Sequence, residues 1–256
     1  MTSNGTEVWQ REHEFAHRTA EQAGRLLLAL RDSNLEPDEL RGQGDRRSHE
    51  FLVTSLAAQF PDDAWLSEEA PAESSRLNAR RVWIIDPLDG TREFGERHRS
   101  DWAVHVALVN DGEPVVGAVS LPAEALTLSA LQPQRVPPRT NGRLRIAVSR
   151  TRPTPLAVAL AERLDADLVP MGSAGAKIAA VVRGDADVYA HSGGQYEWDS
   201  AAPVAVARAA GLHASRIDGS PLRYNQENPW LPDLLVCRPE LSDDVLAAVA
   251  EVSAGL

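Results

Sequence analysis

The chain is poor in cysteine, in lysine and in long apolar segments. Cys237 is the single cysteine, which excludes an internal disulfide and fits a reducing compartment. No apolar run approaches the roughly 20 residues of a membrane span. The first residues are charged, with Glu7, Arg11 and Glu12, and carry no secretory hydrophobic region. We therefore expect a cytoplasmic protein with no membrane partner.

Basic charge is also in deficit. The chain has 26 Lys and Arg against 37 Asp and Glu, a formal net charge of −11. This balance argues against a nucleic-acid polymer as partner, because such partners favour basic faces. It also argues against a phosphate substrate, unless some of the acids form a metal cage, since bound Mg²⁺ inverts the local potential.

Lysine is nearly absent among those basic residues. Lys177 is the one lysine, and the other basic residues are arginine. The arginine bias reflects codon composition. The one lysine indicates a place where a compact ammonium is preferred to a guanidinium, and chance survival explains it equally well.

At 256 residues and 43% hydrophobic composition, the chain can bury a large core. Its periodicity predicts an α+β first half and an α/β second half, and residues 132–142, rich in Pro, Arg and Gly, are the candidate boundary. We expect two tightly docked halves, 1–142 and 143–256, that share a site and act as one unit. The expected helices are 10–32, 45–60, 155–164, 173–182, 199–210 and 242–253. The expected strands are 82–85, 102–109, 115–121, 125–131, 144–149, 187–190, 213–216 and 234–237.

The most informative segment is residues 83–91, which read Trp-Ile-Ile-Asp-Pro-Leu-Asp-Gly-Thr. A buried strand ends at Asp86, and Pro87 and Gly90 then impose a tight turn. Asp86 and Asp89 are thereby held at a strand end beside uncovered amides, an arrangement that suits Mg²⁺ and phosphate. The alternative is an ordinary turn that caps a strand.

Three further acidic positions supply what such a site needs. Glu68 precedes Glu69, and adjacent side chains point apart on an extended chain, so one of the two is expected to ligate. Asp199 and Asp45 each stand where we expect a helix to begin. The alternatives are a surface pair of acids for Glu68 and Glu69, and simple helix caps for Asp199 and Asp45.

Taken together, these carboxylates predict a metal centre. Four of them can hold two or three hard cations about 3.5–4 Å apart. The chain offers no Cys and His ligand set, so zinc is disfavoured and all-oxygen ligation favours Mg²⁺ or Mn²⁺.

Three motifs carry a family resemblance: Glu68-Glu69, Asp86-Pro87-Leu88-Asp89-Gly90-Thr91 and Trp198-Asp199-Ser200-Ala201. With these, the chain resembles the inositol monophosphatase family of Mg²⁺-dependent, lithium-sensitive phosphatases over most of its length. The resemblance implies a layered αβαβα sandwich of the inositol monophosphatase and fructose-bisphosphatase type, and a homodimer. Within the family, the chain is most similar to the CysQ-type 3′-phosphoadenosine 5′-phosphate phosphatases of actinobacteria.

The resemblance also implies a role for each site residue. Glu68, Asp86 and the Leu88 carbonyl hold a first Mg²⁺. Asp86, Asp89 and Asp199 hold a second, and Glu68 with waters holds a weaker third. Mn²⁺ is expected to substitute, and Li⁺ and Ca²⁺ to inhibit.

The catalytic pair implied by the resemblance is Thr91 with Asp45. Thr91, hydrogen-bonded to Asp45, can align an activated water and accept part of its proton. The amides of Gly90 and Thr91 can bind phosphoryl oxygens.

The second half is expected to bind the leaving group. The amides that open the helix at Ser173 suit an anion, and Lys177 lies one turn further on. Tyr224 reads as an exposed aromatic able to stack on a base. The alternatives are a tightly packed small-residue helix with a solvated Lys177, and a loop tyrosine at the rim. His105 is expected in the core, and Arg92, Arg97 and Arg99 are either contacts for a second phosphate or part of a solvated loop.

The resulting hypothesis is an enzyme of sulfur assimilation that removes the 3′-phosphate of 3′-phosphoadenosine 5′-phosphate, and also acts on the sulfated form. One alternative is a phosphatase of broad specificity for inositol phosphate and fructose 1,6-bisphosphate. His191 weakens the inositol alternative, because inositol-specific members tend to carry an acid in that region. Another alternative, from a different class, is a non-catalytic sensor of nucleotide and Mg²⁺.

Overall fold

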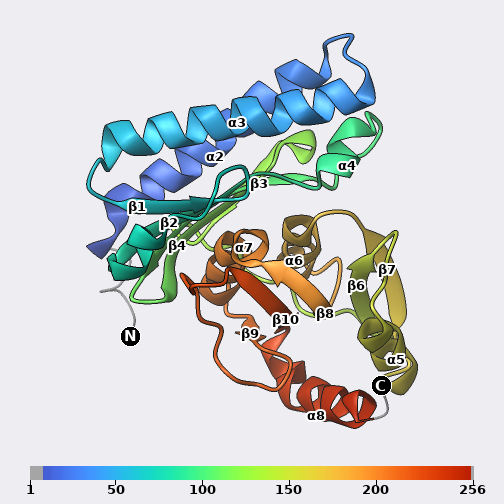
Figure 1. The fold of residues 1–256 in the computed structure, drawn as a ribbon. Helices are drawn as coiled ribbons and strands as arrows, with labels where there is room; N and C mark the ends of the chain where they lie inside the picture. The colour runs from blue at the N-terminus through green and yellow to red at the C-terminus, as the bar shows by residue number, and fades with distance from the viewer. Residues whose placement is uncertain (1–7, 255–256) are drawn as a thin grey trace.

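The structure is a computed structural model that describes residues 8–254. It contains two five-stranded sheets, ordered β1-β2-β3-β4-β5 and β7-β6-β8-β10-β9 (Figure 1). The first sheet comprises β1 (Ala64–Ser67), β2 (Arg81–Asp89), β3 (Ala103–Asn110), β4 (Glu113–Leu121) and β5 (Leu126–Ser129). The second comprises β6 (Arg145–Ser149), β7 (Asp167–Met171), β8 (Val188–Tyr196), β9 (His213–Ser215) and β10 (Trp230–Cys237).

Helices cover the outer faces of both sheets and fill the space between them. They are α2 (Gln10–Arg31), α3 (Pro37–Gln59), α4 (Thr91–Gly95), α5 (Pro155–Arg163), α6 (Ala174–Arg183), α7 (Glu197–Ala209) and α8 (Ser242–Ser253). Short 3₁₀ helices are η1 (Ser74–Asn78), η2 (Pro122–Glu124) and η3 (Pro239–Leu241).

Five layers of secondary structure pack around three apolar cores. One core lies between α2, α3 and the first sheet, a second surrounds α6 and α7 between the two sheets, and a third lies under α5 and α8. Figure 1 shows the same order, with α2 and α3 above the first sheet and α8 at the opposite end. The predicted αβαβα sandwich is confirmed.

Strand β2 explains how the first sheet joins two of these cores. Its side chains alternate between faces. Trp83 and Ile85 belong to the core under α2 and α3, whereas Val82 and Ile84 belong to the core around α6 and α7. Because both faces of the sheet are covered, the β2 sequence is a continuous apolar run, and the polar residues at its end are buried.

The second helix begins earlier than the sequence predicts. Helix α3 starts at Pro37, whose fixed φ suits a first helical position, and its first turn carries Asp38 and Glu39. Gly44 therefore lies within the helix, where an added β-carbon would come within 2.9 Å of Leu88 and within 2.7 Å of the Phe94 ring. The alternative that Asp45 only caps this helix is excluded, because Asp45 follows Gly44 on an inner turn.

Other boundaries also differ from prediction. Strand β8 continues to Tyr196, and α7 begins at Glu197, so Asp199 is the third helical residue and not the cap. Strand β7 and helix α4 were not predicted. β7 is largely exposed, and α4 has only five residues, so neither leaves a clear periodic pattern.

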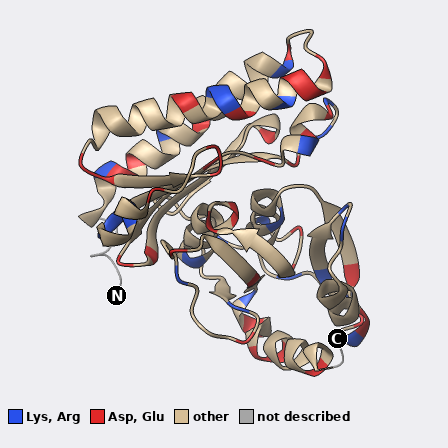
Figure 2. Cartoon of the chain, in the orientation of Figure 1, with Lys and Arg blue, Asp and Glu red and all other residues tan. Residues whose placement is uncertain are grey.

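Charged side chains of both signs are spread over the two halves of the chain (Figure 2). No helix between residues 8 and 254 is both long enough and apolar enough to cross a membrane.

Candidate active site

Two acidic side chains near the end of β2 are buried. Asp86 pairs with His105 on β3, and Asp89 pairs with Ala103, with an irregularity in the ladder between them. The turn is held inside by the Leu88 amide, which donates to Asp86 Oδ1 at 3.0 Å. Asp86 is 1% exposed and Asp89 is 6% exposed. The motif therefore delivers buried carboxylates, and not an exposed capping turn.

Gly90 makes the transition from strand to helix. Its φ of 85° lies in the left-handed region, and an added β-carbon would approach Ser173 to 3.0 Å. The chain then enters α4 at Thr91. Thr91 Oγ1 lies 3.3 Å from Asp45 Oδ1 and 3.1 Å from the Leu88 carbonyl oxygen. The expected contact between Thr91 and Asp45 is present.

Asp45 has an unusual protonation equilibrium. Burial raises its pKa to about 7, and the nearby charge of Glu69 adds to the rise. The hydrogen bond from Thr91 opposes this shift. A carboxylate with a raised pKa is a stronger acceptor for the Thr91 hydroxyl and a better general base near neutral pH.

The charges of Glu68 and Asp199 interact with those of Asp86 and Asp89. Burial raises the pKa of Glu68 to about 8, with further contributions from Asp199 and Asp89. Burial, followed by the charge of Asp89, raises the pKa of Asp199 to about 7. Burial and the same neighbouring acids raise the pKa of Asp86 well above its usual value. Acids far apart in the chain therefore lie close enough to raise one another's pKa.

This repulsion fits a divalent cation site. Carboxylate oxygens of Asp86 and Asp89 approach a His105 nitrogen, with these atoms all within 4.8 Å of one another. The carboxylates of Glu68 and Asp199 add charge to the same region. Oxygen-rich ligand sets of this kind suit hard cations, which also relieve the repulsion between buried acids.

His105 is buried, as predicted, but it also contacts the site, which sequence reasoning missed. Its Nδ1 lies 3.1 Å from the Trp198 carbonyl oxygen and its Nε2 lies 3.2 Å from Asp89 Oδ2. A β-carbon added to Gly175 would lie 2.1 Å from Nε2, so the α6 backbone covers that nitrogen. His105 therefore buttresses Asp89 and has no room at Nε2 for a cation.

The start of α6 also contacts Asp89. The amide of Ala174 donates to Asp89 Oδ1 at 3.2 Å, and that of Gly175 donates to Oδ2 at 2.6 Å. Ser173 Oγ accepts from the Ala176 amide and caps its own helix. The prediction that these amides face a substrate anion needs correction, because they hold a carboxylate of the chain. Ser173 itself is 3% exposed.

Lys177 lies in the first turn of α6, and its side chain folds back toward the residues that precede the helix. It is 4% exposed, and its Nζ donates to the carbonyl oxygens of Gly172 at 2.5 Å and Ser173 at 2.8 Å. Burial lowers its pKa, whereas Asp89 and Asp199 favour the charged form. Lys177 is therefore neither solvated nor placed for direct substrate contact, and it supports the segment that holds Asp89.

The prediction for Tyr224 is wrong. Its ring is 1% exposed within the core between the sheets, and its hydroxyl lies 3.1 Å from Ser200 Oγ. A base cannot stack on a buried ring. Pro221 and Gly219 indicate a turn in the sequence, but they carry no signal of what covers the following tyrosine.

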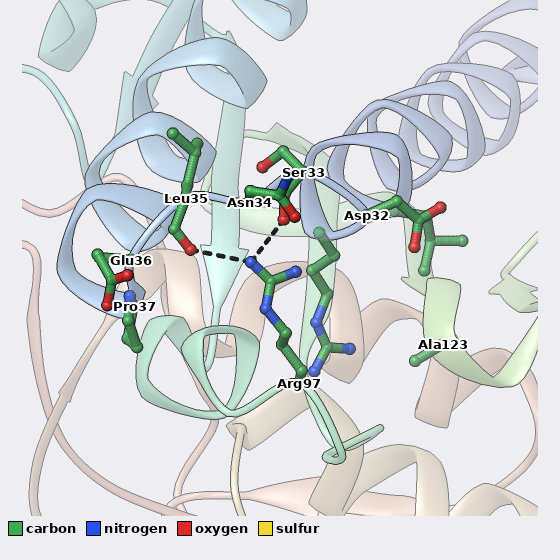
Figure 3. A pocket seen from close by; sticks show the side chains of 10 residues that line it. Asp32, Ser33, Asn34, Leu35, Glu36, Pro37, Arg97 and Ala123 are labelled. Carbon is green, nitrogen blue, oxygen red and sulfur yellow. Dashed lines mark hydrogen bonds between the residues drawn. The ribbon is translucent and has the colours of Figure 1, made fainter.

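The arginines after α4 mostly bind the protein itself. Arg97 Nη2 donates to the carbonyl oxygens of Ser33 at 2.7 Å and Leu35 at 2.9 Å, at a cavity of about 780 Å³ between α2 and α3 (Figure 3). Arg99 pairs with Asp101. Arg97 and Arg99 therefore stabilise loops and do not point toward the acids of the candidate site. Arg92 is exposed and donates to Thr151 Oγ1 at 3.0 Å.

Comparisons with known proteins agree with the site. A model of the inositol monophosphatase family matches residues 9–253. The 3′-phosphoadenosine 5′-phosphate phosphatase of Mycobacterium bovis is 49% identical over 243 residues, covering 90% of each chain. The 3′(2′),5′-bisphosphate nucleotidase CysQ of Escherichia coli is 34% identical over 200 residues, covering 73% of this chain and 80% of that one.

A solved structure shows the same architecture. The crystal structure of CysQ from Bacteroides thetaiotaomicron, a bacterial member of the inositol monophosphatase family, matches with a TM-score of 0.76 at 27% identity. The match covers 90% of this chain and 98% of that one.

Proposed function

The chain belongs to the inositol monophosphatase family of phosphatases, as its motifs predict, and we propose that its substrate is 3′-phosphoadenosine 5′-phosphate. Water cleaves the 3′-phosphate ester, giving AMP and inorganic phosphate. The sulfated nucleotide is a second substrate, and the reaction serves sulfur assimilation. The observation that supports the proposal is the electrostatic interaction among the buried acids Glu68, Asp86 and Asp199, in a chain 49% identical to a phosphatase of that name.

The proposed cation sites use the carboxylates of both halves. Glu68, Asp86 and the Leu88 carbonyl would hold one Mg²⁺. Asp86, Asp89 and Asp199 would hold a second, and Glu68 with waters a third. Mn²⁺ would substitute, and Li⁺ and Ca²⁺ would inhibit. When bound, the cations neutralise phosphoryl charge and lower the pKa of a water.

Thr91 and Asp45 would handle the proton. Thr91 Oγ1 can donate its own proton to Asp45 and accept one from the attacking water. The Asp45 pKa of about 7 matches a group that gains and loses a proton near neutral pH. The first amides of α4, which lack partners within the helix, would bind phosphoryl oxygens at Gly90 and Thr91.

The two halves would divide these tasks. Residues 1–142 supply most cation ligands and the catalytic pair, and residues 143–256 supply Asp199 and contacts to the leaving group. A homodimer completes the proposal, on the family resemblance alone. Light scattering at several protein concentrations would test it.

Phosphate release tests the function directly. With Mg²⁺, we expect kcat/KM for 3′-phosphoadenosine 5′-phosphate to exceed that for inositol 1-phosphate and for fructose 1,6-bisphosphate. Equal efficiency on inositol 1-phosphate would replace the nucleotide assignment with a broad-specificity phosphatase. No release from any phosphomonoester at millimolar Mg²⁺ would favour a sensor.

A further inference from the structure

Two exposed aromatic residues lie on neighbouring strands, and the backbone of one of them contacts Asp199. Between residues 8 and 254, the large hydrophobic side chains exposed to solvent are Val8, Leu77, Leu168, Tyr196 and Trp230. Tyr196 and Trp230, the two aromatic members, are each 46% exposed and face each other across the β8–β10 ladder. Directly paired residues in a ladder project to the same face. The two rings therefore share one surface.

Tyr196 is tied to the active site through its backbone. Its amide donates to Asp199 Oδ2 at 2.6 Å, so its backbone, and not its ring, contacts a carboxylate of the cluster. Its ring stacks on Trp198, with centroids 4.7 Å apart and planes 6° from parallel. Trp198 in turn packs against the core between the sheets. An exposed ring held this firmly offers a flat surface with little conformational freedom to lose on binding.

Trp230 is positioned by a glycine on the neighbouring strand. Gly194 has a φ of 92°, and an added β-carbon would lie 2.2 Å from the Trp230 indole nitrogen. The indole therefore lies against the glycine backbone, and no side chain there could be tolerated without moving it. Gly193, with a φ of 99°, has nothing within 4 Å of such a carbon, so the chain next to Gly194 is open to solvent on that side.

We infer that Tyr196 and Trp230 form the surface on which the purine base of the substrate stacks while its 3′-phosphate lies at the carboxylates. The inference rests on the proposed function. Aromatic rings bind bases through their faces, whatever the base. The nucleoside has to leave the carboxylates in some direction, and Tyr196 is hydrogen-bonded to one of them.

We assign to Tyr196 and Trp230 the base-stacking role that was expected of Tyr224. The core buries Tyr224, whereas Tyr196 stands three residues before Asp199 and stays exposed. The assignment also makes the second half responsible for recognising the leaving group.

Kinetics on two substrates test the inference. Tyr196→Ala and Trp230→Ala should each raise KM for 3′-phosphoadenosine 5′-phosphate about tenfold, the scale of losing one stacking ring. Both should leave kcat/KM for glycerol 2-phosphate, which has no base, within about twofold of the wild-type value. Tyr196→Phe should behave as wild type, because stacking needs the ring and not the hydroxyl. Leu168→Ala, at another exposed apolar position, is the matched control.

Three results would overturn the inference. One is an unchanged KM for the nucleotide in both alanine variants. Another is an equal loss on glycerol 2-phosphate, which would mean that the rings only support Asp199. The third is dissociation of a dimer with unchanged nucleotide kinetics, which would assign the rings to a contact between copies of the chain.

The wild-type protein separates this inference from the proposed function. Failure of the wild type to release phosphate from the nucleotide would overturn the function. Release that does not respond to either substitution would overturn the aromatic surface alone. Titration with AMP, followed by tryptophan fluorescence, adds a binding readout: affinity should fall about tenfold in Tyr196→Ala and stay unchanged in Leu168→Ala.

Discussion

The corner at the end of β2 and the face formed by α6, β8 and α7 meet at the same carboxylates but are built differently. In the first, Asp86, Asp89 and Thr91 lie within six consecutive residues, held by one strand end, one glycine and one short helix. In the second, the groups come from α6 and from the continuous segment formed by β8 and α7, and several face inward. The β2 corner is encoded locally, whereas the second face depends on how distant elements pack.

The comparison predicts its largest effect at Asp86. Asp86→Asn removes a carboxylate shared by both proposed cation sites, so phosphate release should fall on the order of a thousandfold or more on every substrate. The same change removes one of the repelling buried acids, so the cation-free protein should melt at a higher temperature. Phosphate assays and thermal melting in EDTA measure the two effects. Retained turnover would break the proposed role of the β2 corner.

Thr91 should show the next largest effect. Thr91→Ala removes the hydroxyl that contacts Asp45, and kcat should fall by roughly 10²–10⁴ with KM little changed. Thr91→Ser keeps a hydroxyl and should restore most of the activity. Steady-state kinetics on the nucleotide and on glycerol 2-phosphate should show the same loss, since this corner does not read the leaving group. A loss confined to KM would contradict the assignment.

A substitution of Lys177 tests the face formed by α6, β8 and α7. Lys177→Met preserves most of the volume but removes the ammonium donor from the Gly172 carbonyl and leaves the Ser173 carbonyl only the amide of residue 177, which should cost about 1–3 kcal/mol of unfolding free energy. Denaturant melts measure this loss. Activity should fall by the same factor on the nucleotide and on glycerol 2-phosphate, because Lys177 acts through the segment that holds Asp89. A selective rise in KM for the nucleotide would restore the direct substrate contact.

The smallest effect is a pH dependence of stability in the cation-free protein. The pKa of Glu68 rises from 4.5 to about 8 and that of Asp199 from 3.8 to about 7, so the folded state binds these protons more tightly than the unfolded state. The unfolding free energy should therefore fall as pH rises from about 4 to about 8. Melting in EDTA at pH 5 and pH 8 should show a lower midpoint at pH 8.

Added Mg²⁺ provides the control for that experiment. Cations bind the deprotonated carboxylates, so they should raise the melting temperature more at pH 8 than at pH 5. Equal shifts at both values, or a higher cation-free midpoint at pH 8, would contradict the buried-acid cluster.

Sequence reasoning succeeded where a few adjacent residues determine the geometry. The apolar strand before Asp86 is present as predicted, although β2 does not end there but continues to Asp89, with an irregularity between the two aspartates. The layered sandwich followed from the family motifs.

Reasoning from the sequence failed where burial decides the role of a residue. Tyr224 and Tyr196 both follow turn-forming residues, yet one ring lies in the core and the other is exposed. His105 reads as a core histidine, and its contact with Asp89 depends on the pairing of β3 with β2 and on the approach of Gly175. Local pattern carries no information about such long-range contacts.

The central claim is that acids of both halves share divalent cations, and anomalous diffraction from crystals soaked in Mn²⁺ tests it most directly. The account predicts anomalous peaks within coordination distance of Asp86, with one peak bridging Asp86, Asp89 and Asp199. Peaks that touch Asp86 and Asp89 but leave Asp199 uncoordinated, or no peak at these residues, would contradict it.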